Sequence, residues 1–223
     1  QFSERVVGVI SQNVESESIA TAAAYVVIYV GVFLAARKFD FDFWDGERKF
    51  GYGGYKYIPG RLTDLAKKII KKYKLNNNSK ILDIGAGKGY LLYEIKLLLP
   101  SIYVRGIDIS RYALKNSQPT IKKYLKHQKA QDKLGYKNNF FDLVISINCL
   151  HNLKIFDLYK SLKQIQKIGK KSYIVNESFR NEKELFNLQC WSLTAQAFFS
   201  KIEWEWILKM NNYKGDYEFI YFK

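Results

Sequence analysis

Hydrophobic positions in the chain alternate between short continuous runs and helical patterns, the order expected of an α/β protein. Residues 81–84 and 142–148 are nearly continuous apolar runs, typical of parallel strands buried on both faces. Residues 61–74 and 158–168 place apolar side chains three and four positions apart, which predicts amphipathic helices. The remaining strands are expected over residues 102–107, 127–130, 172–176 and 217–222. Strands and helices therefore alternate from residue 61 onward.

This alternation predicts a single α/β domain over residues 39–223, a Rossmann-like three-layer sandwich. Its sheet is expected to be mostly parallel, with helices on both faces. Two more helices are predicted over residues 182–199 and from Ser200 to about residue 210. The closing strand over residues 217–222 is expected to be antiparallel to its neighbour.

An N-terminal extension over residues 1–38 precedes this domain. Residues 19–36 form an apolar run of 18 uncharged residues, followed at once by Arg37 and Lys38. Such a run is long enough for a membrane-anchor helix, with the bases placing the following domain in the cytoplasm. The alternative is a buried helix or strand pair that packs on the domain. Both interpretations stay open at this point.

Residues 39–60 mix aromatic side chains with Asp, Gly and Lys and have no amphipathic period. This composition predicts an ordered loop or a lid. Tyr52 and Tyr55 are candidates to fold over a ligand, or they cover only the edge of the core.

The most informative motif is KILDIGAGKGYLLYEI over residues 80–95. A buried strand ends near Asp83, then Gly85, Gly87 and Gly89 follow at two-residue spacing, and a helical pattern begins. Glycines in such a turn allow sharp bends and the close approach of a ligand. The helix N-terminus adds unpaired N–H groups. The sequence therefore predicts a ligand site in this turn.

A second acidic residue, Asp108, ends the next predicted strand, 19 residues after Gly89. A carboxylate at roughly 20 residues from the glycine turn can accept hydrogen bonds from ribose hydroxyls. With LDIGAGKG and GIDIS in this order, the sequence resembles the class I S-adenosylmethionine-dependent methyltransferases. The glycines are spaced G-x-G-x-G rather than G-x-G-x-x-G, which argues against a dinucleotide site.

The resemblance implies S-adenosylmethionine as the cofactor and assigns residues to it. Its methionine part is expected against the three glycines, with Asp83 near the amino group, and its ribose at Asp108 beside Ile109. The family usually has an acidic residue after the third strand, where this chain has Ala130. Asp132 or the backbone of Gln131 is expected to replace this contact, and Asn148 is expected to contact the cofactor after the fourth strand.

The acceptor side is expected at the ends of the fourth and fifth strands. His151 is the candidate general base, because the pKa of imidazole lies nearest neutrality. Glu177 is a second candidate base, and Arg180 is a candidate to hold an anionic substrate. Structural or capping roles for these three residues remain alternatives.

Composition narrows the choice of partner. The net charge of +15 comes almost wholly from scattered lysines, with only seven arginines, and this argues against nucleic acid as the substrate. Cys149 and Cys190 form no disulfide framework and no metal spacing. We therefore expect methyl transfer to a small-molecule acceptor. The stretches FGYGGYKY and NESFRNE resemble methyltransferases of surface-sugar biosynthesis, and this resemblance implies a sugar or surface-polysaccharide precursor. The alternatives are an RNA methyltransferase and a non-catalytic scaffold; the oligomeric state is not predicted.

Overall fold

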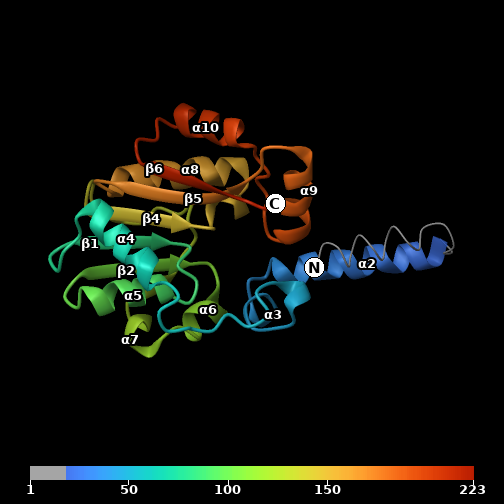
Figure 1. Cartoon of the computed structure of the whole chain (residues 1–223), viewed down its shortest axis with the longest axis horizontal. Coiled ribbons are helices and arrows are strands. Elements are labelled where there is room, and N and C mark those ends of the chain that lie inside the picture. Colours follow the sequence, from blue (N-terminus) through green and yellow to red (C-terminus); the bar gives the residue numbers. More distant parts are fainter. Residues whose placement is uncertain (1–18) are drawn as a thin grey trace.

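The computed structural model describes residues 19–223, with side chains described from residue 26 onward, and its centre is a six-stranded sheet (Figure 1). The strands are β1 (Lys80–Ile84), β2 (Tyr103–Asp108), β3 (Leu125–His127), β4 (Leu143–Ile147), β5 (Ser172–Ser178) and β6 (Asp216–Tyr221). Their order is β3-β2-β1-β4-β5-β6, and every neighbouring pair is parallel. The order reverses direction at β1, so the crevice for a ligand lies beyond the carboxyl ends of β1 and β4.

The closing strand differs from the sequence prediction. β6 pairs with β5 in parallel, with Tyr173 opposite Asp216 and Ser178 opposite Tyr221. The reason is the intervening helix α10 (Lys201–Met210), which carries the chain back to the starting edge of the sheet before β6 begins. The predicted antiparallel strand is wrong, whereas the predicted Rossmann-like sandwich is confirmed.

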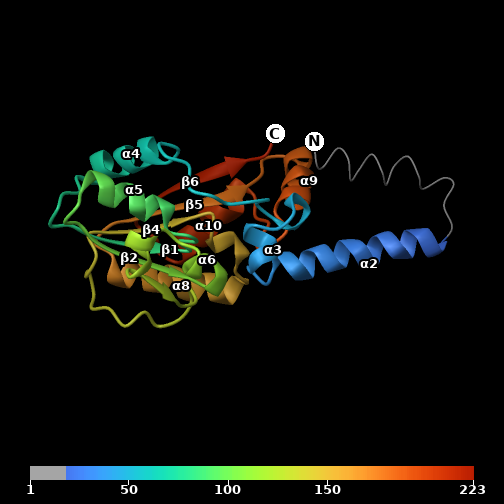
Figure 2. The same cartoon turned by 90° about the horizontal axis from the view of Figure 1, so that it is seen from below.

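Helices cover both faces of the sheet (Figure 2). On one face, α4 (Thr63–Tyr73) and α5 (Tyr90–Leu98) share a core with Ile81 of β1. On the other face, α8 (Ile155–Ile168) and α10 share a core with Leu82. Successive residues of a strand point to opposite faces, so this alternation explains why β1 is apolar on both sides.

Two other predicted boundaries are wrong. The third strand, β3, ends at His127 instead of running over residues 127–130. The chain between α6 (Arg111–Lys115) and β3 contains only the short helix α7 (Pro119–Lys122), so the strand begins earlier than predicted. The helix predicted over residues 182–199 stops early, as α9 (Glu182–Trp191). Beyond it, the N–H groups of Gln196 and Ala197 both donate to the carbonyl of His151, which draws the chain out of the helical path.

The N-terminal part consists of α2 (Ile19–Ala36), α3 (Phe41–Trp44) and the 3-10 turn η1 (Arg48–Phe50). α2 extends away from the sheet, and Val26, Val27 and Ile28 on it are exposed (Figure 1). The predicted buried helix is therefore wrong. Among the described residues, no helix is long and apolar enough to cross a membrane. Residues 1–18 of the predicted extension lie outside the described residues.

Candidate functional site

A first cavity of about 410 Å³ lies at the carboxyl ends of β1, β2 and β4. Six of the eight residues predicted to bind the cofactor line it. These six are Asp83, Gly85, Gly87, Asp108, Ile109 and Asn148. Residues that are scattered along the sequence are thus brought to one crevice, as the parallel sheet requires.

The glycine turn between β1 and α5 forms one wall of this cavity. Gly85, Gly87 and Gly89 all have positive φ angles, of 81°, 55° and 73°. A Cβ atom at Gly85 would overlap with Cys149, and one at Gly87 would lie 2.7 Å from the Trp44 ring. Gly89 does not line the cavity, because it faces Leu125 and Ile121 instead. The structure thus places the third glycine in helix–strand packing rather than at the predicted cofactor contact.

Two buried carboxylates face each other across this turn. Asp108 accepts the backbone N–H of Gly87 and that of Ser110, each at 2.7 Å. Asp83 is 4% exposed, and its carboxylate accepts no hydrogen bond from the described residues. Burial, with a smaller effect from Asp108, raises the pKa of Asp83 to about 7. A positively charged ligand group would relieve both the desolvation and the repulsion.

The residues predicted at the adenine end are divided by the structure. Ala130 and Gln131 line the first cavity, whereas Asp132 does not. Asp132 is exposed, and its carboxylate accepts the N–H of Lys129 at 3.3 Å within its own turn. The Asp132 carboxylate therefore has a structural role in its own turn and does not line the first cavity.

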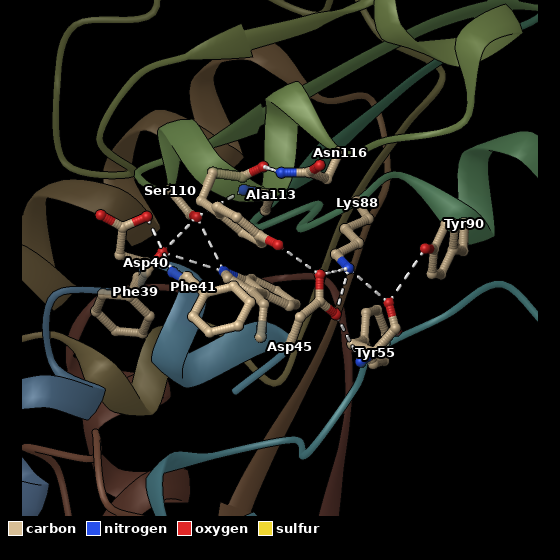
Figure 3. Close-up of polar contacts among 12 residues, drawn as sticks. Phe39, Asp40, Phe41, Asp45, Tyr55, Lys88, Tyr90, Ser110, Ala113 and Asn116 are labelled. Carbon is tan, nitrogen blue, oxygen red and sulfur yellow. Dashed lines mark hydrogen bonds and ion pairs between the residues drawn. The ribbon is translucent and has the colours of Figure 1, made fainter. Parts of the chain in front are cut away.

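Residues 39–60 lie over the first cavity, as the lid interpretation predicts, and they are held there by polar contacts (Figure 3). The Lys88 ammonium, from the glycine turn, donates to both oxygens of Asp45 at 2.7 Å. It also donates to the carbonyl of Tyr55 at 2.8 Å. Tyr112 adds a hydrogen bond of 2.8 Å to Asp45. Burial alone would raise the pKa of Asp45, but these donors outweigh it and hold the pKa below its ordinary value.

A second attachment of this segment is made by Trp44. Its indole N–H donates to Ser110 Oγ at 2.9 Å and to the carbonyl of Phe39 at 3.1 Å. Ser110 in turn caps α6 by accepting the N–H of Ala113. The ring of Trp44 thus lies between Gly87 and the start of α6, and it forms part of the cavity wall.

A second cavity, of about 490 Å³, adjoins the first. Five residues line both cavities, namely Phe43, Tyr52, Tyr55, Asn148 and Asn152. The second cavity also contains both candidate catalytic residues. Further lining residues come from the lid, from the position directly after it, from the end of α9 and from the segment that follows α9. These further residues include Arg48, Lys49, Arg61, Cys190, Trp191 and Thr194.

His151 and Glu177 meet in this second cavity. His151 lies in the turn η2 (Leu150–Asn152) after β4, Glu177 lies near the end of β5, and His151 Nε2 is 3.4 Å from Glu177 Oε2. This distance is long for a hydrogen bond, and Glu177 Oε2 and His151 Nδ1 have no partner among the described residues. Burial lowers the pKa of His151 more than Glu177 raises it, so the imidazole is neutral near pH 7. A neutral, buried imidazole next to a carboxylate can take up a proton.

Arg180, the predicted anion ligand, lies elsewhere. It is not part of either cavity, and its guanidinium forms an ion pair with Glu184 and lies over the Tyr221 ring. Its role in the structure is to join the start of α9 to the end of β5 and to β6.

Sequence reasoning missed the contacts that hold the lid. Lys88 looks like one more surface lysine, yet it is 3% exposed, and its partner Asp45 lies 43 positions earlier. No recognisable motif contains four other residues of the second cavity, Asn152, Arg48, Arg61 and Trp191. Only the aromatic character of residues 39–60 was a signal that this segment meets the site.

The comparison with known families agrees with this geometry. A family model described as a methyltransferase domain matches residues 75–216, which include strands β1 to β5 and the first residue of β6. The chain belongs to this methyltransferase family. S-adenosylmethionine is the cofactor that the resemblance predicts, and the class I Rossmann-like assignment is confirmed.

Relatives of this methyltransferase differ in their functions. It is 30% identical over 138 residues to the ribosomal RNA small subunit methyltransferase C of Buchnera aphidicola from Schizaphis graminum, covering 56% of this chain and 41% of the relative. It is 29% identical over 134 residues to the mitochondrial arginine-hydroxylase of Mus musculus, covering 60% and 36%. The chain thus spans well under half the length of these relatives.

Among solved structures, the YcgJ protein of Bacillus subtilis superposes with a TM-score of 0.53. The identity is 17%, and the match covers 66% of each chain. This likeness confirms the fold of the methyltransferase domain.

The first cavity fits the cofactor of the family. S-adenosylmethionine carries an ammonium and a sulfonium, and Asp83 offers a buried carboxylate without a hydrogen-bond donor among the described residues. Gly85 and Gly87 leave the space that a Cβ would fill. The negative charge of the ionised carboxylates is thus opposite in sign to the ammonium and sulfonium of the ligand.

Proposed function

We propose that this methyltransferase binds S-adenosylmethionine in the first cavity and methylates a small molecule held in the second. The observation that carries the proposal is the adjoining position of the two cavities, with Tyr52, Tyr55 and Asn148 lining both. A ligand in each would meet at these three residues. Positioning two reactants against each other supplies a large part of the rate enhancement in such transfers.

In the cofactor cavity, Asp83 would receive the ammonium and Asp108 the ribose hydroxyls. Both Asp108 oxygens already accept backbone N–H groups, which fixes the carboxylate in one orientation. When bound, S-adenosylmethionine supplies a methyl group that is already electrophilic because it is attached to a sulfonium. The protein then needs only to orient the acceptor and take up its proton.

We assign to His151 the role of general base, which accepts the proton of the acceptor. Its pKa is lowered by burial, so it is neutral and able to accept a proton from an acceptor in the second cavity. Glu177 Oε2, 3.4 Å from Nε2, would then stabilise the imidazolium. Glu177 thus supports His151. If the acceptor lies closer to the carboxylate of Glu177 than to the imidazole, Glu177 is the base instead.

Calorimetric titration of the whole chain with S-adenosylmethionine and S-adenosylhomocysteine tests the cofactor assignment. We expect micromolar binding of both, and no binding of NAD at the same concentrations. A folded sample that binds neither sulfur ligand would favour the scaffold alternative and contradict the proposal. His151→Asn and Glu177→Gln should retain cofactor affinity and lose methyl transfer; a loss of affinity in both would move these residues to the cofactor.

An RNA acceptor is the second candidate, because a curated relative is a ribosomal RNA methyltransferase. The net charge of +15 would attract any RNA at low salt, so such attraction is not evidence. Sequence-dependent RNA binding that persists at about 0.2 M salt would favour this candidate over a small molecule.

A further inference from the structure

The second cavity differs from the first in the kind of polar atoms that it presents. Two of its lining residues, Asn152 and Glu177, each have a buried oxygen, Oδ1 and Oε2, without a partner among the described residues. Both atoms can only accept hydrogen bonds, since one is an amide oxygen and the other is a carboxylate oxygen. A buried acceptor without a donor costs free energy, so these oxygens favour a ligand that brings hydroxyl or amine hydrogens.

The cavity is also lined by positively charged side chains. Arg48 and Arg61 line it, and neither forms an ion pair with the described residues. Lys49 also lines it, but Lys49 pairs with Glu47 at 3.0 Å. Arginine presents several N–H groups in a fork that matches phosphate and carboxylate oxygens.

One of these arginines is held in place by a ring. The Arg48 guanidinium lies over the Trp191 ring at 4.6 Å, and it also donates to the carbonyl of Gly51. A guanidinium that is stacked in this way loses less entropy when it binds an anion. Trp191 itself is 49% exposed and presents a flat apolar surface to the cavity.

From these observations we infer that the acceptor is an anionic, hydroxyl-bearing small molecule of the sugar phosphate type. Its hydroxyl end lies at Asn152, His151 and Glu177, and its phosphate lies between Arg48 and Arg61. This inference rests on the proposed function and specifies the acceptor of that same site. The methylated hydroxyl loses its proton to His151, the new bond joins its oxygen to the methyl carbon, and the electron pair of the broken carbon–sulfur bond stays on sulfur.

The test is a binding experiment on the whole chain in the presence of saturating S-adenosylhomocysteine. The probes are glucose phosphates and UDP-glucose, with neutral glucose as the uncharged control. We expect at least one phosphate-bearing probe to bind at least about tenfold more tightly than glucose. Equal or absent binding of all probes, in a sample that binds S-adenosylhomocysteine, would overturn this inference and leave the methyltransferase proposal standing. Failure to bind S-adenosylhomocysteine would instead overturn the methyltransferase proposal.

Variants separate the cavity from the overall positive charge. Arg61→Gln should weaken the phosphate-bearing probe about tenfold, the loss of one charge-assisted hydrogen bond, while leaving glucose unaffected. Arg180→Gln removes the same charge outside both cavities, and it should change neither affinity. An equal effect of both variants would mean non-specific attraction and would contradict the inference. A short RNA hairpin that displaces the probe at about 0.15 M salt would assign the phosphate site to RNA instead.

Discussion

The Lys88 ammonium lies 2.7 Å from each carboxylate oxygen of Asp45, and this buried ion pair joins the glycine turn of β1 to the segment over residues 39–60. Neither residue lines either cavity itself, but each belongs to a segment that does. Their contact fixes the position of Tyr55, whose carbonyl is the third acceptor of the same ammonium. Lys88 is thereby a positioning residue for the cofactor cavity.

Lys88→Met should therefore lower cofactor affinity roughly tenfold, because the lid loses the contact that pre-organises it. The same change should lower the free energy of unfolding by about 2 kcal/mol, below the range for fully buried pairs, since Asp45 is one-fifth exposed. Calorimetry and urea denaturation measure the two effects. Lys170→Met is the matched control: Lys170 pairs with Asp142 at 2.8 Å, but it is 59% exposed and distant from both cavities. Equal effects of the two variants would contradict the positioning role.

Asp108→Asn should weaken S-adenosylmethionine binding by about 1.5–3 kcal/mol, the loss of a charge-assisted hydrogen bond to the ribose. The domain should remain folded, since the amide oxygen can still accept one backbone N–H. Asp132→Asn removes a carboxylate of the same kind from an exposed turn, and it should not change the affinity. A strong effect at Asp132 would restore it as the adenine contact that the sequence predicted.

Cofactor affinity should rise with pH and level off above about pH 7. Only ionised Asp83 attracts the ammonium, and the pKa of this group is about 7. Below that value, affinity should fall by up to about tenfold per pH unit. The Asp83→Asn variant should bind the cofactor weakly and lose this part of the pH dependence. Titration of the ligand itself would persist in the variant, so the variant distinguishes the two causes. An unchanged pH profile in the variant would contradict the assignment.

The same pKa governs stability without cofactor. The folded-state pKa of Asp83 is raised above its unfolded value of 3.8, so the folded protein holds the proton that the unfolded chain has lost. Stability should therefore fall as pH rises from about 4 to about 7, and then remain level. Urea denaturation of the wild type and of Asp83→Asn across this range isolates the contribution. The opposite slope at Asp83 would show that a donor pairs with it.

Gly85→Ala should destabilise the fold by about 3 kcal/mol or more. The left-handed backbone at φ 81° costs about 1–2 kcal/mol for alanine, and the new Cβ would also overlap with Cys149. Gly135→Ala is the control for strain alone, since its φ is 77° and no atom lies within 4 Å of the position that a Cβ would take. Melting curves of the two variants should differ clearly; similar losses would exclude a role for Cys149.

The local pattern was sufficient to predict most of this fold and one half of the site. The run 81–84, the glycine turn and Asp108 are close in sequence to the elements that they form, and the cofactor cavity contains them as expected. The orientation of β6 was not predictable in this way, because it depends on where α10 returns the chain. Gly89 follows the motif, yet it contacts Leu125, a residue of a strand that the pattern placed two positions too late.

Local partners account for some of the other failures, and contacts between distant segments account for the rest. Arg180 and Asp132 have the right chemistry at plausible positions, but each is occupied by a local partner, Glu184 and the N–H of Lys129. The arginines of the second cavity, Arg48 on the lid and Arg61 directly after it, are far in sequence from His151 and Glu177. Side chains that meet only through tertiary packing leave no periodic signal in the sequence.

The shared wall of the two cavities has a thermodynamic consequence. If a ligand in one cavity shifts Tyr52, Tyr55 or Asn148, it changes the affinity of the other cavity, and the second ligand must change the first by the same factor. The two binding events would then be linked even without direct contact between the ligands. Retention of the spent cofactor would depend on whether the methylated product has left, so turnover would be governed by the order of departure.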